Sequence, residues 1–493
     1  MRSQTAPGSL SGSTTMGAQS MQRRTAGSKP PAATTTSGST LVQDAAASKP
    51  PSRRQLVAAQ TRLLRLSLWV RIASVGALIL NAQLQQAFDT SHELLAFALD
   101  PNGAHGLSTG HFRWLLAFVR WDTVYFLAAA SPTAAEGLHV GGYRWEHMLA
   151  FQPGIVALLR ILGYVTPSLD GSWSPTSAML LAAALANVAA VVAPLLLFRL
   201  TLRVTEQIEL ATAAAVLSVF APSAATTLSA PTPEPFFSAA SLAGMLCLEQ
   251  ARLGWTRLLA ASVWFGVATA FRANGTLLIG YTAYKLLAQA RTHGFAKAAL
   301  QLAVSAAVCV SPTVLFQTWA YGRFCLAEGG RPWCSAVPPS VYAFVQAEYW
   351  HVGWLRYWEV AQLPNFALAA PVLVAIVATA RLYYRTSSRA QLLASLLAAH
   401  PPAQRRLGFT LSSVPRAVPY VVHGLVLAVV LLFASHVQIA LRLATPGGMP
   451  MVWWGLAHAV LYARPWLRPL VLSYLGIQMC VSCVLYAGFY PPA

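Results

Sequence analysis

A polar segment between two apolar stretches holds the side chains best suited to chemistry. Its central acid is Asp122, which lies between Trp121 and Tyr125 in the sequence. A carboxylate among apolar side chains is a stronger base than one in water. We therefore predict that Asp122 takes the proton of an acceptor hydroxyl in a group-transfer reaction. The alternative is a carboxylate that pairs with Arg120 or Arg113 and only fixes the loop.

Other polar residues stand close to this segment or at the ends of apolar stretches. Glu146 and His147 are adjacent and suit the positioning of an acceptor hydroxyl or a phosphate; the alternative is a surface acid beside a structural histidine. Arg272 follows an apolar stretch, and its planar fork of donors suits a lipid phosphate. An arginine there can equally mark only a helix end or fix the topology.

A third group lies late in the chain. His436, Gln438 and Arg442 fall within two helical turns near the end of an apolar stretch. Such side chains are costly in lipid, so they are expected either to face a cavity or to have a structural role. Glu234 stands among prolines, and we interpret it as the start of a helix.

The composition places these residues in a membrane protein. Of the 493 residues 56% are hydrophobic and 10% are charged, against about 25% charged residues in soluble chains. The formal charge of +19 fits arginines that face lipid head groups better than a nucleic-acid partner. The sequence has no P-loop, GxGxxG, GxSxG or HExxH motif, which favours a lipid-linked donor over a nucleotide sugar.

The apolar stretches predict an all-α, polytopic fold of about 11 spans. Residues 1–55 are expected to be a disordered cytosolic tail, and residues 56–493 the membrane domain. Arginine placement puts the polar segments 85–164 and 322–364 together on the non-cytosolic side. The stretch Phe151–Tyr164 is predicted to be a re-entrant or interfacial helix. The expected spans are Leu66–Leu84, Ala178–Phe198, Leu210–Leu228, Phe236–Leu248, Leu258–Phe271, Leu277–Leu287, Ala296–Tyr321, Phe366–Tyr384, Tyr420–Leu443, Met451–Ala463 and Leu470–Tyr486.

Two pairs of cysteines stand close in sequence. Cys325 and Cys334 share the second polar loop and are able to form a disulfide if that loop is lumenal; two free thiols are the alternative. Cys480 and Cys483 lie one turn apart in an apolar stretch, where a packing role is favoured over a redox or zinc pair.

Several separated motifs together resemble one known family, from about residue 56 onward. They are Trp121-Asp122 with Gly142-Tyr143 and Glu146; Ala150-Phe151 with Pro153; Ser229-Ala230-Pro231 with Glu234; Arg272 with Asn274-Gly275; Phe316-Gln317, Tyr321, Phe324-Cys325 and Trp333-Cys334; the block from Pro339-Ser340-Val341-Tyr342 through Gln346, Tyr349-Trp350, Val352-Gly353, Leu355-Arg356-Tyr357-Trp358 and Gln362 to Pro364-Asn365-Phe366; and His423, His436-Val437-Gln438, Arg442 and Tyr490-Pro491-Pro492. The chain resembles the second mannosyltransferase of glycosylphosphatidylinositol (GPI) anchor synthesis, of the GT-C class.

The resemblance implies an activity in the endoplasmic-reticulum (ER) membrane. It is transfer of mannose from dolichol-phosphate mannose to the GPI precursor in the ER lumen, in an α-1,6 linkage. The reaction inverts the sugar carbon, with Asp122 as the base. No cofactor or metal is expected, and a small membrane subunit is a further implied partner. The residues to which the resemblance gives substrate contacts are Glu146, His147, Arg272, Arg356, His436, Gln438 and Arg442.

The chain departs from the family pattern in two places. Extra residues at about 131–140 separate Asp122 from Gly142-Tyr143, and Thr232-Pro233 fill a turn that usually reads Ser-Ala-Pro-Tyr-Ser-Glu. Two other functions are weighed against this one, namely another GT-C mannosyltransferase and a multi-span lipid or solute transporter. A transporter would place its ionisable residues at the bilayer midplane and would have repeat symmetry.

Overall fold

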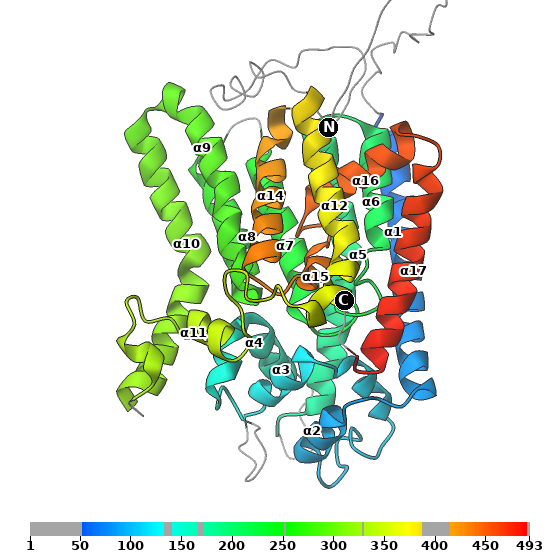
Figure 1. Cartoon of the computed structure of the whole chain (residues 1–493), viewed down its shortest axis with the longest axis vertical. Coiled ribbons are helices and arrows are strands. Elements are labelled where there is room, and N and C mark those ends of the chain that lie inside the picture. The colour runs from blue at the N-terminus through cyan, green and yellow to red at the C-terminus, as the bar shows by residue number, and fades with distance from the viewer. Residues whose placement is uncertain are drawn as a thin grey trace, which may run out of the picture. The chain divides into compact units, whose positions relative to one another are not determined.

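Long helices make up most of the protein (Figure 1). The computed structural model describes residues 52–132, 141–165, 172–250, 253–327, 330–386 and 415–490, and the regular elements in these ranges are helices. They are α1 (Arg53–Leu84), α2 (Ser91–Leu99), α3 (Asp122–Ala130), α4 (Pro153–Leu162), α5 (Pro175–Thr205), α6 (Ile208–Val219), α7 (Pro233–Leu248), α8 (Trp255–Phe271), α9 (Ile279–His293), α10 (Phe295–Tyr321), α11 (Val341–Glu348), α12 (Leu363–Thr386), α14 (Val418–Phe433), α15 (Ile439–Leu443), α16 (Pro450–Tyr462) and α17 (Leu467–Ala487), joined by short 3-10 and π turns.

Five of the described helical segments are long and apolar enough to cross a membrane. They are Arg53–Leu84, Pro175–Thr205, Phe295–Ala327, Val360–Arg385 and Leu467–Ala487. The prediction of a multi-span, all-α protein is therefore confirmed, while the count of about 11 spans stays a prediction. The stretch predicted as a re-entrant or interfacial helix contains the short α4, and its position relative to the membrane stays a prediction.

The first helix begins earlier than predicted. It starts at Arg53 rather than Leu66, because Ser52 caps it: the Ser52 hydroxyl accepts the Gln55 N–H, and the Gln55 side chain accepts the Ser52 N–H. The predicted disordered tail, residues 1–55, lies outside the described residues except for 52–55.

Two predicted spans are interrupted. The stretch Leu210–Leu228 is helical only to Val219, because the proline and the serine and threonine hydroxyls that follow favour turns over helix. The stretch Tyr420–Leu443 breaks after Phe433, whose carbonyl accepts the Leu355 N–H at 2.6 Å instead of continuing the helix.

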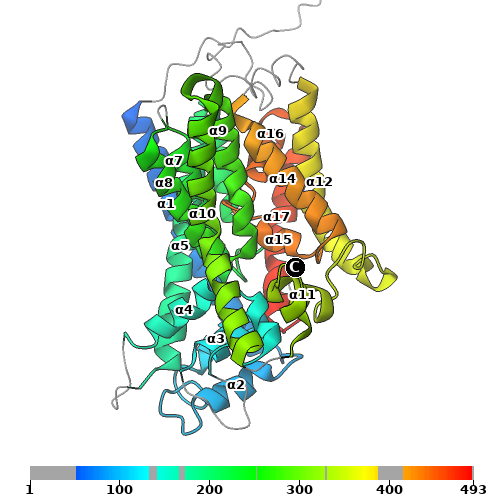
Figure 2. The same ribbon diagram turned by 90° about the vertical axis from the view of Figure 1, so that its left-hand side faces the viewer.

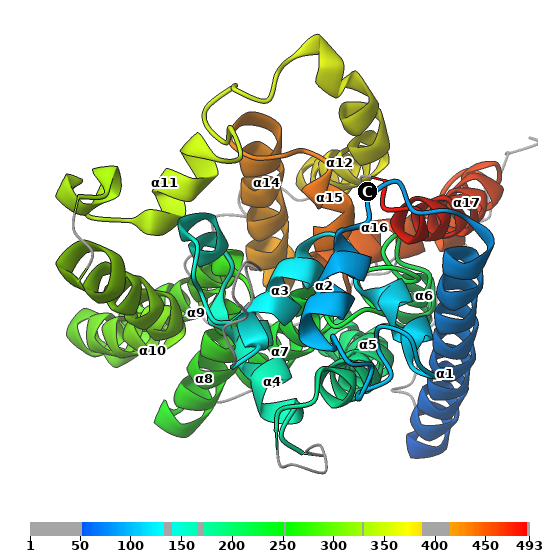
Figure 3. The same ribbon diagram turned by 90° about the horizontal axis from the view of Figure 1, so that it is seen from below.

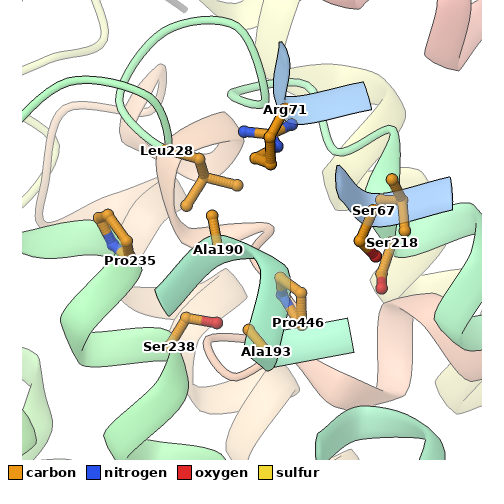
Figure 4. A pocket seen from close by; sticks show the side chains of 10 residues that line it. Ser67, Arg71, Ala190, Ala193, Ser218, Leu228, Pro235, Ser238 and Pro446 are labelled. Atoms are coloured by element: carbon orange, nitrogen blue, oxygen red, sulfur yellow. The ribbon is translucent and has the colours of Figure 1, made fainter. Parts of the chain in front are cut away.

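The irregular segment before α7 is held from two neighbouring helices. Its residues, Ala221–Thr232, are all buried, which non-helical backbone within a membrane protein requires. Arg71 of α1 donates to the Ala224 carbonyl at 2.5 Å and to the Ser229 hydroxyl at 3.4 Å. Asn187 of α5 donates to the Ser229 carbonyl at 3.0 Å. Figure 4 looks into the cavity of about 10 Å³ beside this arginine.

The two polar segments meet at one end of the helices, as predicted from charge. Helices α2, α3 and α4 gather there, with α11 beside them (Figures 2 and 3). Leu149 and Ala150 of the first segment pack in one apolar cluster with Trp333 and Val341 of the second. The two segments therefore lie on the same side of the protein.

The cysteine pairs differ in state. Cys325 and Cys334 form a disulfide in the second segment, so the first of the two alternatives holds. Cys480 and Cys483 are both free; Cys483 is buried in an apolar cluster, in agreement with the predicted packing role, whereas Cys480 is exposed.

Candidate active site

Asp122 is the first residue of α3 and is partly open to solvent. Its side chain is 29% exposed. The preceding residue, Trp121, has φ +52°, a backbone angle that few residues other than glycine adopt. This turn begins α3 at the carboxylate, where the helix N-terminus favours negative charge. The buried side of α3, with Phe126 and Leu127, anchors it in an apolar cluster.

A row of alternating charges starts at Asp122. Its Oδ2 lies 2.8 Å from Nη1 of Arg442. The same guanidinium contacts Oε1 of Glu234 through Nε at 2.8 Å and Nη2 at 2.7 Å. Glu234 in turn pairs with Arg272. Two acids and two arginines from four separate segments thus form one network.

Each member of this network stands at or near the end of its element. Arg272 is the residue that follows α8, Glu234 is the second residue of α7, and Arg442 lies in the five-residue α15. A carboxylate at a helix N-terminus is favoured by the peptide dipoles. Glu234 is also 1% exposed, and a buried carboxylate requires partners of this kind. The interpretation of Glu234 as only a helix start is therefore incomplete.

The network borders a cavity of about 230 Å³. Asp122, Arg272 and Arg442 line its polar part. Its other walls include residues of α14 and α15, and these are largely apolar. They are Leu427, Val430, Leu431, Ile439 and Leu443. The cavity therefore combines two cations with an apolar wall, which suits a phosphate attached to a lipid chain.

Asp122 also lines a second cavity, of about 580 Å³. Its walls come from α2, α3 and the segment around Trp145, with Phe489 closing one side. His147, one of the predicted contacts, lies in this lining. The carboxylate of Asp122 is therefore accessible from two separate spaces.

Glu146 is engaged inside the protein. The indole N–H of Trp333 donates to its Oε1, and the Tyr349 hydroxyl donates to its Oε2 at 3.1 Å. Burial, and then the contact with Glu146, raise the pKa of Tyr349. Glu146 thus connects the first polar segment to the second. A contact of Glu146 with substrate stays a prediction.

His436, Gln438 and Arg356 are the other residues predicted to contact substrate. His436 Nε2 lies 2.6 Å from the Trp350 carbonyl, and the Tyr357 hydroxyl donates to Gln438 at 2.8 Å. Trp350 lines the 230 Å³ cavity, so His436 supports its wall. Gln438 contacts Tyr357, which lines neither cavity. Arg356 is exposed, its one hydrogen bond among the described residues goes to the Ala347 carbonyl at 3.5 Å, and it is not brought to either cavity.

Within the described ranges, no three His, Cys, Asp or Glu side chains gather as metal ligands. Metal independence remains a prediction.

Comparison with known sequences identifies the family of this chain. The family model described as Mannosyltransferase (PIG-V) matches residues 60–493. The chain belongs to the PIG-V mannosyltransferase family.

Relatives within this family span most of the chain. The "GPI mannosyltransferase 2" of Cryptococcus neoformans var. neoformans serotype D is 31% identical over 408 residues, which are 76% of this chain and 88% of the relative. The "GPI alpha-1,6-mannosyltransferase 2" of Cricetulus griseus is 32% identical and covers 71% of this chain and 74% of its own length. The apo oligosaccharyltransferase of Archaeoglobus fulgidus is 12% identical with a TM-score of 0.39, over 90% of this chain and 57% of that one.

Several residues of this PIG-V family member line the cavity without having been predicted as contacts. Tyr342, Gln346 and Trp350 fall in the long motif block, of which only Arg356 was predicted as a substrate contact. Gln152 accepts the Thr313 hydroxyl at 3.0 Å and lines the same space. Its signal was an amide directly before the proline that starts α4.

Proposed function

We propose that this mannosyltransferase transfers mannose from dolichol-phosphate mannose to the one-mannose GPI precursor and forms an α-1,6 linkage, in the lumen of the ER. The names of its relatives support the linkage and the GPI acceptor. The observation that carries the mechanism is the position of Asp122. It lies beside two arginines on one side and opens into a second cavity on the other.

The donor is proposed to occupy the 230 Å³ cavity. Arg442 and Arg272 would hold the phosphate, since guanidinium forks match phosphate oxygens. The apolar wall of α14 and α15 would take the first part of the dolichyl chain. The same arginines stabilise the charge that develops on the phosphate as it leaves, so a separate general acid is not required.

Asp122 is proposed as the general base. Arg442 contacts its Oδ2, which fixes the carboxylate and directs Oδ1 to the acceptor. The acceptor oxygen loses its proton to Asp122, forms a bond to C1 of mannose, and the bond from C1 to the phosphate oxygen breaks. Attack on the side opposite the phosphate inverts C1. One carboxylate is sufficient for such a reaction.

The test is mannosyl transfer in microsomes that lack the endogenous enzyme. We expect the wild-type chain to convert the one-mannose precursor to the two-mannose species, and Asp122→Asn to stall at one mannose at equal expression. Glu93→Gln is the matched control, since Glu93 is a half-exposed acid of the same segment and pairs only with Arg113. Full activity of Asp122→Asn would overturn the role of Asp122.

Other outcomes of this assay bear on the wider proposal. A wild-type chain that changes no GPI intermediate would contradict the substrate assignment. A small membrane subunit is part of the proposal as well. We therefore expect affinity purification of the chain from ER membranes to recover a small membrane protein with it. Full activity of the purified chain alone would contradict the need for such a subunit.

A further inference from the structure

The two cavities that share Asp122 differ in charge. The 230 Å³ cavity contains Arg272 and Arg442. None of the described residues that line the 580 Å³ cavity is Lys or Arg, whereas two of them, Asp89 and Asp122, are acids. A phosphate therefore suits the first cavity. The second suits a ligand that donates hydrogen bonds to carboxylates.

Aromatic rings form much of the second cavity. Trp121, Tyr125 and Trp145 line it, and Tyr125 and Trp145 are 42% and 44% exposed. Such rings offer flat apolar faces with a polar group at the edge. The C–H face of a sugar ring packs on such a surface, while the sugar hydroxyls reach the acids nearby.

Neighbouring contacts hold two of these rings in place. The Trp121 indole donates to the Tyr490 carbonyl at 2.9 Å, and its ring lies 5.7 Å from that of Phe489. The Tyr125 ring stacks on Phe151 at 5.8 Å. Rigid rings lose little conformational entropy on binding, which favours recognition.

Asp89, Asp122 and Tyr125 line the same cavity. The Asp89 carboxylate accepts the Ser91 N–H at 2.6 Å, and the hydrogen bonds from Ser91 lower the pKa of Asp89. Burial, and then the charges of Asp122 and Asp89, raise the pKa of Tyr125. Both carboxylates therefore belong to the lining of a cavity with exposed aromatic rings, where they can accept hydrogen bonds from sugar hydroxyls.

We infer that the 580 Å³ cavity is the acceptor subsite, in which Trp145 and Tyr125 stack on sugar rings of the acceptor glycan and Asp89 accepts hydrogen bonds from its hydroxyls. This inference rests on the proposed function. It places the attacking hydroxyl and the leaving phosphate on opposite sides of Asp122. Proton loss to Asp122, bond formation at C1 and release of the phosphate then proceed without either substrate changing cavity.

The test separates the Michaelis constants (KM) of the two substrates in full-length enzyme purified from ER membranes together with any subunit that accompanies it. The donor is dolichol-phosphate mannose, and the acceptor is a short-chain analogue of the one-mannose precursor. We expect Trp145→Ala to raise the acceptor KM about twofold to tenfold, the range for loss of one aromatic stack, with the donor KM unchanged. Asp89→Asn should act in the same direction, and Trp145→Phe should restore most of the acceptor affinity.

Trp354→Ala is the matched control, because Trp354 is 68% exposed, stacks on Phe433 and lines neither cavity. A thermal melt of each variant confirms folding, and the Trp145→Phe variant retains the ring volume if Trp145→Ala is unstable. If these variants raise the donor KM, or leave both KM values unchanged, the acceptor subsite lies elsewhere. If wild type itself forms no mannosyl product, the proposed function fails instead.

Discussion

Replacement of Glu234 by glutamine is the most informative change to the charge network. Glu234 is the carboxylate between Arg442 and Arg272. The variant keeps the shape of the side chain and removes its charge. Two buried guanidinium groups then share a neutral amide, while Asp122 becomes the only acid in contact with Arg442.

The contacts of Glu234 set the size of the expected effect. It is 1% exposed and lies 2.7 Å from Arg442. Removal of one partner from such a buried pair costs about 3–5 kcal/mol of folding free energy, because the remaining charge is left without compensation. An exposed pair such as Arg113 with Glu93 contributes less than about 1 kcal/mol. We also expect transfer per folded molecule to fall at least tenfold, which corresponds to about 1.4 kcal/mol in the barrier, because Arg442 is no longer fixed by the Glu234 charge and so holds Asp122 less firmly in one position.

Glu249→Gln is the matched control at the other end of α7. Glu249 is also buried, with Lys285 at 2.8 Å and the Tyr420 hydroxyl at 3.0 Å, but it lines neither cavity beside Asp122. Thermal melts in detergent and mannosyl transfer, scaled to folded protein, are measured for both variants. Both should lose stability, and only Glu234→Gln should lose transfer per folded molecule. Equal transfer by the two variants would refute the idea that this network positions Asp122.

Two further predictions concern the loops. Cys325→Ser removes a disulfide between residues 9 apart. We expect the protein to lose about 2–3 kcal/mol of stability, because the unfolded chain gains loop entropy, and this loss is seen as a lower melting temperature. Cys247→Ser is the control, and an unchanged melting temperature of Cys325→Ser would contradict the prediction. Burial, and then the charge of Arg120, lower the pKa of His92 from 6.5 to about 4. The unfolded chain binds this proton near pH 6.5 and the folded protein only near 4, so the melting temperature should fall from pH 6.5 towards 4, and His92→Gln should reduce this fall. An identical pH dependence in the variant would contradict that role of His92.

The sequence was sufficient to place most helices and the residue at the centre of the site. Apolar stretches marked α5, α10, α12 and α17 within a few residues, because length and hydropathy are local properties. The placement of arginines predicted that the two polar segments lie on one side. The contact between Glu146 of the first segment and Tyr349 of the second agrees with this. Asp122 stood out because few acids occur in the chain.

What the sequence could not show is which distant residues meet. Glu234 and Arg442 are 208 residues apart, and no local pattern reports that separation. Glu146 looked available to substrate because Trp333 and Tyr349, which occupy it, come much later in the chain. The helix break after Phe433 has a similar cause, since its carbonyl bonds to Leu355 of another segment. Tertiary contacts decided each of these cases.

The bond between Trp121 and Tyr490 has a consequence for biosynthesis. The two residues are separated by 369 positions. Phe489, the neighbour of Tyr490, lines the second cavity. At about 5–20 residues per second, a ribosome needs roughly 20–70 seconds to make that interval. During this time the Asp122 loop has already left the ribosome but lacks its final wall. The growing chain therefore carries Asp122 beside an incomplete cavity until the segment around Phe489 has been made.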